Sequence, residues 1–142
     1  MAGITRFGER TADGAACFRC AACGAAAGVV RAARAGALVD LGPMAGRHDP
    51  GRDGFVIDYF LGIVWFAADP AAVDAVQAIL DAGRADPAAL RLICRELAPF
   101  FCPDCELNYC GADWNAEVLW DEGFYDRTFG TCPRGHRHLL DD

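Results

Sequence analysis

Four short groups of metal-binding side chains constrain this chain more than any other feature of its sequence. Each group holds two candidate ligands separated by only two or three residues, so it can place two ligands on one ion but not four. The groups are Cys20 with Cys23, Cys102 with Cys105, Cys110 with Asp113, and Cys132 with His136. A tetrahedral zinc site needs four ligands, so four pairs predict two Zn2+ ions.

The number of cysteines favours metal over disulfides. The chain has eight cysteines in 142 residues, and its first residues lack the apolar stretch of an export signal. We therefore expect a cytoplasmic, reducing environment, in which C-x-x-C pairs are more often metal sites than disulfides. No apolar run approaches the length of a membrane span, so membrane association is not expected.

The charge of the chain argues against nucleic acid as a partner. The formal net charge is −7, and three thiolates around one Zn2+ make the surface more negative still. All 13 basic residues are arginines, and they are scattered singly rather than gathered in a stripe. A phosphate backbone would be repelled by such a surface.

Between the first and second ligand pairs, the sequence predicts a small αβ unit. Residues 29–32 and 37–41 are expected to form short strands, and residues 55–66 a strand that Gly62 bends or turns into a hairpin. Two helices are expected to begin at Asp69-Pro70 and Asp86-Pro87, because aspartate caps a helix and proline suits its first position.

The remaining segments are expected to carry the metal. Residues 117–120 and 124–129 flank Asp121-Glu122-Gly123, which is typical of a β-hairpin. The predicted organisation is an N-terminal arm with the first zinc knuckle (1–27), an inserted αβ unit (28–101) and a second zinc-binding unit (102–142). The first and last of these would form one metal-bound module. Cys94 is predicted to be a buried core thiol, and His48 a solvated loop residue.

The spacing of the ligands resembles the cross-brace of RING and FYVE domains. Only four residues separate Cys105 from Cys110, which is too few for both pairs to surround one ion. In a cross-brace, the first and third pairs hold one zinc and the second and fourth pairs hold the other. The resemblance therefore implies one site of Cys20, Cys23, Cys110 and Asp113, and another of Cys102, Cys105, Cys132 and His136.

Two departures from that pattern leave alternatives open. Asp113 stands where cysteine or histidine would be expected, and Cys17 or His138 could take its place. Alternatively, the pairs could bind in sequence: Cys20, Cys23, Cys102 and Cys105 would then form a rubredoxin-like zinc ribbon that could also hold iron. The second knuckle lacks the glycine usual in that family, because Glu106 follows Cys105.

The first knuckle and the C-terminal half also resemble a group of small zinc proteins of high-GC bacteria. The shared motifs are C-P-x-C at Cys102–Cys105, Y-C-x-x-x-W at Tyr109–Trp114 and C-P-x-G-H at Cys132–His136. This resemblance implies no particular function. The expected fold class is α+β, a small zinc-stabilised domain of zinc-ribbon or treble-clef hairpins with an inserted αβ unit.

Three functions fit these features. The first is a zinc-binding interaction or adaptor module, in its narrower form a RING-like platform of a bacterial ubiquitin-like conjugation pathway. Its partner would be another protein, such as a conjugating enzyme or one encoded in the same operon. The aromatic residues near the second knuckle, Trp114, Trp120, Phe124 and Tyr125, could anchor such a partner or fill the hairpin core. The alternatives are a metalloenzyme with an open zinc position and a thiol-based redox or metal sensor.

Overall fold

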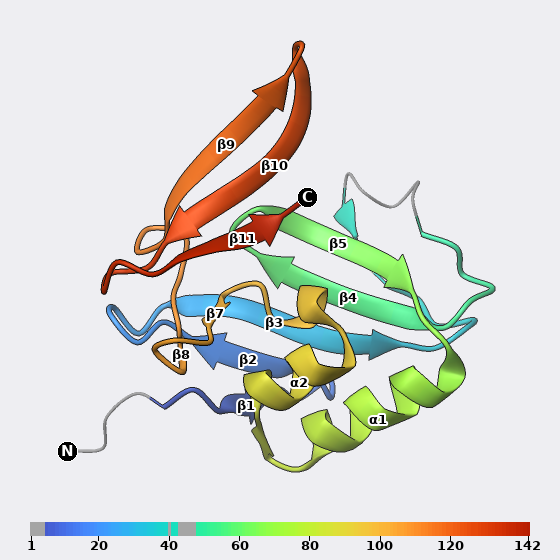
Figure 1. Ribbon diagram of the computed structural model, residues 1–142. Coiled ribbons are helices and arrows are strands. Elements are labelled where there is room, and N and C mark those ends of the chain that lie inside the picture. Colours follow the sequence, from blue (N-terminus) through green and yellow to red (C-terminus); the bar gives the residue numbers. More distant parts are fainter. Residues whose placement is uncertain (1–4, 40, 43–47) are drawn as a thin grey trace.

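A six-stranded antiparallel sheet forms the body of the molecule (Figure 1). The computed structural model describes residues 5–39, 41–42 and 48–142. The order of the strands in the sheet is β5-β4-β3-β2-β1-β6, and every neighbouring pair is antiparallel. The strands are β1 (Gly8–Arg10), β2 (Ala16–Arg19), β3 (Ala26–Ala33), β4 (Gly54–Tyr59), β5 (Gly62–Ala67) and β6 (Arg84–Ala85).

Two helices cover one face of this sheet (Figure 1). Helix α1 spans Pro70–Asp81 and α2 spans Pro87–Ile93, so both predicted Asp-Pro starts are confirmed. Asp86 caps α2 by accepting a hydrogen bond from the Ala88 N–H at 3.0 Å, whereas the side chain of Asp69 makes no such bond. A single 3-10 turn, Arg95–Leu97, follows α2.

The sheet differs in part from the sequence prediction. The hairpin around residues 60–61 is confirmed, and residues 29–32 lie within β3. The predicted strand at 37–41 is wrong at residues 37–39 and 41, and Asp40 lies outside the described residues. Strands β1 and β2 precede residue 28, where the inserted unit was expected to begin, yet they pair into the same sheet as β3 and β4.

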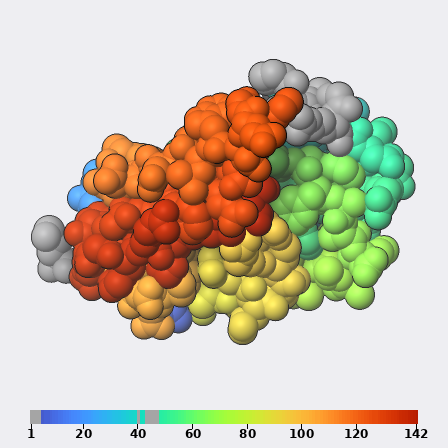
Figure 2. All heavy atoms as spheres, turned by 45° about the horizontal axis from the view of Figure 1, so that its top comes forward, coloured from blue at the N-terminus to red at the C-terminus, as the bar shows by residue number. Residues whose placement is uncertain are grey.

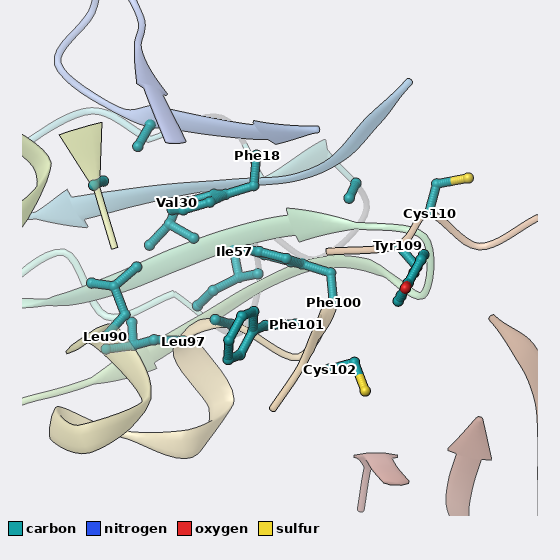
Figure 3. Packing of buried hydrophobic residues seen from close by; sticks show 14 of the residues in the cluster. Phe18, Val30, Ile57, Leu90, Leu97, Phe100, Phe101, Cys102, Tyr109 and Cys110 are labelled. Carbon is teal, nitrogen blue, oxygen red and sulfur yellow. The ribbon is translucent and has the colours of Figure 1, made fainter. Parts of the chain in front are cut away.

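The main core lies between the sheet and the helices. It contains Val30 and Ile57 from the sheet, Leu90 from α2, and the rings of Phe18 and Phe100, all fully buried. Gly28 allows Phe100 to lie against the sheet, because a Cβ atom there would stand 2.3 Å from its ring. Figure 3 shows that Cys102 and Cys110 lie at one end of these packed rings. The apolar core is therefore continuous with the cysteines.

Two residues differ from their predicted surroundings. Cys94, at the C-terminal end of α2, packs against the main core but is only half-buried, and its thiol donates to a Glu96 carboxylate oxygen at 2.9 Å. His48 is half-buried rather than solvated, with its ring 5.0 Å from that of Trp65.

The C-terminal residues form two smaller sheets. Strands β7 (Phe101–Cys102) and β8 (Leu107–Asn108) form a short hairpin, and β9 (Asn115–Asp121), β10 (Phe124–Thr131) and β11 (Arg137–Asp141) form a three-stranded sheet in the order β11-β10-β9. The predicted turn at Asp121-Glu122-Gly123 is confirmed, with positive φ at Glu122 and Gly123. The fold class is thus α+β, with mostly antiparallel sheets. Among the described residues, none of the helices combines the length and apolar character needed to cross a bilayer.

Candidate metal centres

The first group of ligand-type side chains, which we call the histidine cluster, consists of Cys102, Cys105, Cys132 and His136. Its four donor atoms all lie within 4.8 Å of one another. The Nδ1 atom of His136 is 3.1 Å from the Cys105 sulfur, 3.4 Å from that of Cys132 and 3.8 Å from that of Cys102. The β7–β8 hairpin supplies two of these residues, and the turn between β10 and β11 supplies the other two.

The second group, the carboxylate cluster, consists of Cys20, Cys23, Cys110 and Asp113. Its donor atoms also lie within 4.8 Å of one another. Asp113 Oδ2 lies 3.0 Å from the Cys20 sulfur and 3.3 Å from that of Cys110, and the sulfurs of Cys23 and Cys110 are 3.5 Å apart. Cys20 and Cys110 are buried, Asp113 is half-buried and Cys23 is exposed.

Both clusters have the dimensions of a tetrahedral zinc site. With Zn–S bonds near 2.3 Å and Zn–N or Zn–O bonds near 2.0 Å, ligand atoms stand about 3.5–3.8 Å apart. The sulfur pairs at 3.5 and 3.6 Å match this spacing, whereas the Cys20–Asp113 and Cys105–His136 contacts, at 3.0 and 3.1 Å, are shorter than it. A disulfide would bring sulfurs to about 2.05 Å, and all eight cysteines are free. Thiolate with imidazole or carboxylate is a donor set that suits zinc.

Similar tight turns hold the two C-x-x-C knuckles. In the first, the Gly24 N–H donates to the Cys20 carbonyl at 2.9 Å, and in the second the Glu106 N–H donates to the Cys102 carbonyl at 2.8 Å. The residue after the second cysteine has positive φ in both, 79° at Gly24 and 57° at Glu106. Gly24 suits this left-handed conformation because it has no Cβ atom, and Glu106 adopts it although glycine is favoured there.

A short segment after the second knuckle connects the clusters. Asn108, which is almost fully buried, accepts a hydrogen bond at its carbonyl from the Ala21 N–H at 2.8 Å, and its side chain donates to the Arg6 carbonyl at 2.9 Å. The Phe100 carbonyl accepts from the Tyr109 N–H at 3.0 Å and from the Trp114 ring nitrogen at 3.1 Å. The two knuckles are therefore held together by hydrogen bonds as well as by packing.

Without a cation, most of the shifted thiol pKa values favour the protonated form. Burial raises the pKa of Cys102 to about 12, and burial also raises the pKa values of Cys20 and Cys110. Cys132 is different: burial raises its pKa, but the N–H groups of His136 and Arg134, with Cys105 and the His136 ring, lower it to about 7. A divalent cation would supply the positive charge that lets these thiols ionise together.

Hydrogen bonds from the thiols of Cys20 and Cys110 lower the pKa of Asp113. The carboxylate cluster therefore presents an ionised oxygen among its sulfurs. An ionised carboxylate is an acceptable zinc ligand, although an uncommon one in structural sites.

The grouping of the side chains distinguishes between the alternative ligand pairings that the sequence left open. Among the described residues, Cys20 and Cys23 lie with Cys110 and Asp113, not with Cys102 and Cys105 as a sequential ribbon would require. Within the part of the chain that the structure describes, Cys17 belongs to no such group; it lies on β2, paired with Val29 of β3.

His138 lies beside the histidine cluster instead of the carboxylate cluster. Its Nε2 is 2.8 Å from Asp104 Oδ2, and these two residues form a third ligand-type group with Cys102. Sequence reasoning missed this Asp104–His138 contact. Asp104 lies inside the C-P-D-C knuckle, but the partner that β11 brings to it is 34 residues away in the chain.

Comparison with known families gives one match. A family model described as "Domain of unknown function (DUF8328)" matches residues 9–142. Neither the curated proteins nor the solved structures contain a match to the chain.

Proposed function

Because the chain belongs to the DUF8328 family, a domain of unknown function, we propose its role from its own side chains: it is a zinc-stabilised protein–protein interaction module. One Zn2+ ion, in the carboxylate cluster, would hold the segment after β8 to the β2–β3 turn of the larger sheet, and the other, in the histidine cluster, would join the two smaller C-terminal sheets. The surface that the C-terminal hairpins present would bind a partner protein.

The composition of the clusters supports a structural role for the metal. Each cluster gathers four protein side chains, which is the full number for tetrahedral zinc and leaves no position for substrate or water. Catalytic zinc usually has three protein ligands and one open position. The metalloenzyme alternative is therefore the weaker one.

The exposure of the hairpin supports an interaction surface, and it is the observation that carries this proposal. Trp120, Phe124 and Tyr125 are 66%, 77% and 43% exposed, whereas Trp114, near the base of the same hairpin, is buried. A cluster of large apolar side chains on a surface indicates an interaction site, because side chains that stay exposed contribute little to the folded core. Three of the four aromatics noted in the sequence are thus available to a partner.

Native mass spectrometry of the untagged protein tests the metal half of the proposal. We expect two zinc ions, and we expect the folded charge-state distribution to be lost once a chelator has removed both. Cys94→Ala, outside both clusters, should keep both ions. One ion, or iron, would contradict the proposal.

The narrower role as a RING-like platform rests on ligand spacing alone. It predicts that a ubiquitin-like conjugating enzyme encoded near this gene is retained by the zinc-loaded protein and released by chelator. No retention in that pull-down would remove this version while leaving the general one intact.

One observation favours a second candidate function, a redox sensor. The Cys23 thiol is exposed while it stands 3.5 Å from the Cys110 sulfur. Peroxide could oxidise these two thiolates to a disulfide, itself being reduced to water, and the ion would leave. Zinc release followed with a colorimetric chelator tests this: no release at millimolar peroxide would reject sensing.

A further inference from the structure

The outer half of the β9–β10 hairpin carries an apolar group that we call the aromatic tip: Val118, Trp120, Phe124 and Tyr125. All four side chains are more than 40% exposed. In Figure 1 the hairpin rises away from the six-stranded sheet, with β11 beside the lower part of β10. The space-filling view shows the C-terminal segments (orange to red) forming much of one face of the molecule (Figure 2). The aromatic tip is therefore accessible to another molecule.

The aromatic tip has apolar side chains on both of its faces. Trp120 and Tyr125 are paired across the strands, so they share one face, and their rings meet edge to face at 6.1 Å. Phe124 is paired with Asp121, one position along the ribbon, and so lies on the opposite face. A flat partner could cover only one of these faces. A cleft that receives the tip would cover both.

The base of the hairpin is held firmly. Thr128 is buried, and a Cβ atom on Gly130 would stand 2.5 Å from Leu140, which shows how closely the strands pack. The Tyr125 hydroxyl lies 2.9 Å from that of Thr128 and donates to Asp141 Oδ2 at 2.5 Å. A rigid base presents the tip at low entropic cost on binding.

The charges at the tip indicate the chemistry of its partner. Asp121 and Glu122 are exposed, and within the described part of the chain neither forms an ion pair. By contrast, the nearby Glu117 and Asp126 are paired with Arg137 and Arg127. Two exposed carboxylates beside the apolar group favour a partner with arginine or lysine at the matching position.

The same charges argue against two other occupants. A symmetric contact between two copies would place Asp121 and Glu122 of both copies close together, on chains of net charge −7 each. An anionic lipid surface would repel the tip carboxylates in the same way.

We propose that the aromatic tip inserts into an apolar cleft of a different protein, whose rim carries arginine or lysine. This inference rests on the proposed interaction function and adds the place of binding and the nature of the partner. It predicts that binding depends on Trp120 and Phe124 for contact and on Asp121 and Glu122 for charge.

Site-specific photo-crosslinking tests the proposal. The zinc-loaded full chain carrying p-benzoylphenylalanine at position 124 is irradiated in an extract of its source cells, and the crosslinked residues are mapped by mass spectrometry. The captured protein is then purified, and its affinity is measured by calorimetry at low and high salt. We expect crosslinks to apolar residues flanked by arginine or lysine, and an affinity that falls at higher salt.

Substitutions separate the tip from the rest of the surface. Trp120→Ala and the pair Asp121→Lys with Glu122→Lys should each weaken binding at least tenfold. Leu92→Ala, at a side chain that is 90% exposed on α2, is the matched control and should leave affinity unchanged. Each variant must retain the zinc content and melting temperature of the parent protein.

Other outcomes would overturn the proposal. Crosslinks only to a second copy, binding to vesicles of phosphatidylcholine with one-fifth phosphatidylserine, tighter binding after charge reversal, or the absence of any crosslink would each do so. A partner that binds the zinc-loaded protein equally well after Trp120→Ala would overturn only the proposal that the aromatic tip is the binding site. The general interaction function would then survive, because that partner would still bind the zinc-loaded protein through another part of its surface.

Discussion

The histidine cluster and the carboxylate cluster are built on the same plan from different donors. Each takes one C-x-x-C knuckle with a left-handed residue after it and a second pair from a distant turn. They differ in the fourth side chain and in exposure: Cys105 is half-buried in one, and the corresponding Cys23 is exposed in the other. Water can reach the exposed Cys23 thiolate, and carboxylate is an uncommon ligand in structural zinc sites. We infer that the carboxylate cluster would hold a zinc ion less tightly than the histidine cluster, which would contribute more to the stability of the fold.

Removing one cysteine from each cluster tests that difference with the largest expected effect. Structural zinc sites contribute about 10–16 kcal/mol in small domains, which equals or exceeds a typical folding stability of about 5–15 kcal/mol. Cys102→Ala should therefore abolish cooperative thermal unfolding monitored by circular dichroism. Cys23→Ala removes an exposed ligand and should leave a folded protein with a lower melting temperature. Equal loss of the fold in both variants would show that the clusters contribute alike.

Trp114 tests whether the clusters depend on one another. It follows Asp113, and it packs against Gly130, two residues before Cys132. Trp114→Ala should cost about 3–5 kcal/mol in the free energy of unfolding and weaken zinc binding at both clusters. Trp120→Ala, 66% exposed, is the matched control and should change stability by less than about 0.5 kcal/mol. Chemical denaturation measures both, and a loss confined to one cluster would indicate that they are independent.

The donor difference predicts an order of zinc loss. In competition with a chromophoric chelator, one ion should leave at concentrations at least tenfold lower than the other. Asp113→Cys should remove that gap by supplying a fourth thiolate, and Asp113→Ala should widen it. If Asp113→Cys left the two steps unchanged, the early ion would have to come from the histidine cluster.

The two knuckles offer the smallest and finest test. Left-handed backbone costs a non-glycine residue about 1–2 kcal/mol, so Gly24→Ala should destabilise the protein by roughly that amount. Glu106→Gly should stabilise it by less, because it also removes the exposed ion pair with Arg6 at 3.3 Å. Melting temperatures of the two variants should therefore move in opposite directions. If both melting temperatures moved in the same direction, the left-handed conformation would not carry the same energetic cost in the two knuckles.

Local signals in the sequence predicted much of this molecule. The ligand pairs, both Asp-Pro helix starts and the Asp121-Glu122-Gly123 turn each depend on residues a few positions apart, so their chemistry can be read from the chain. The grouping of the pairs agrees with the cross-brace spacing, although the metal itself stays a prediction.

Long-range pairing explains most of what could not be predicted. Strand β6 has only two residues, and it exists because β1, more than 70 positions earlier, pairs with it. Strand β11 depends on its pairing with β10, and that pairing brings His138 to Asp104, 34 positions earlier. Alternation along the chain could not tell the buried Trp114, just before β9, from the exposed Trp120 on β9, because the two are an even number of positions apart and differ only in the tertiary packing around them.

Because the ligand pairs of the two clusters alternate along the chain, the order in which the clusters form should differ between refolding of the full-length chain and folding during synthesis. The carboxylate cluster joins residues 87 positions apart, as in Cys23 with Cys110, and the histidine cluster joins Cys105 to Cys132 over 27. Closing the longer loop costs about 1 kcal/mol more in chain entropy, so a full-length chain refolding from denaturant should complete the histidine cluster first. On the ribosome the sequence is reversed, because Asp113 is synthesised before Cys132. The nascent protein should therefore acquire its weaker ion before its stronger one.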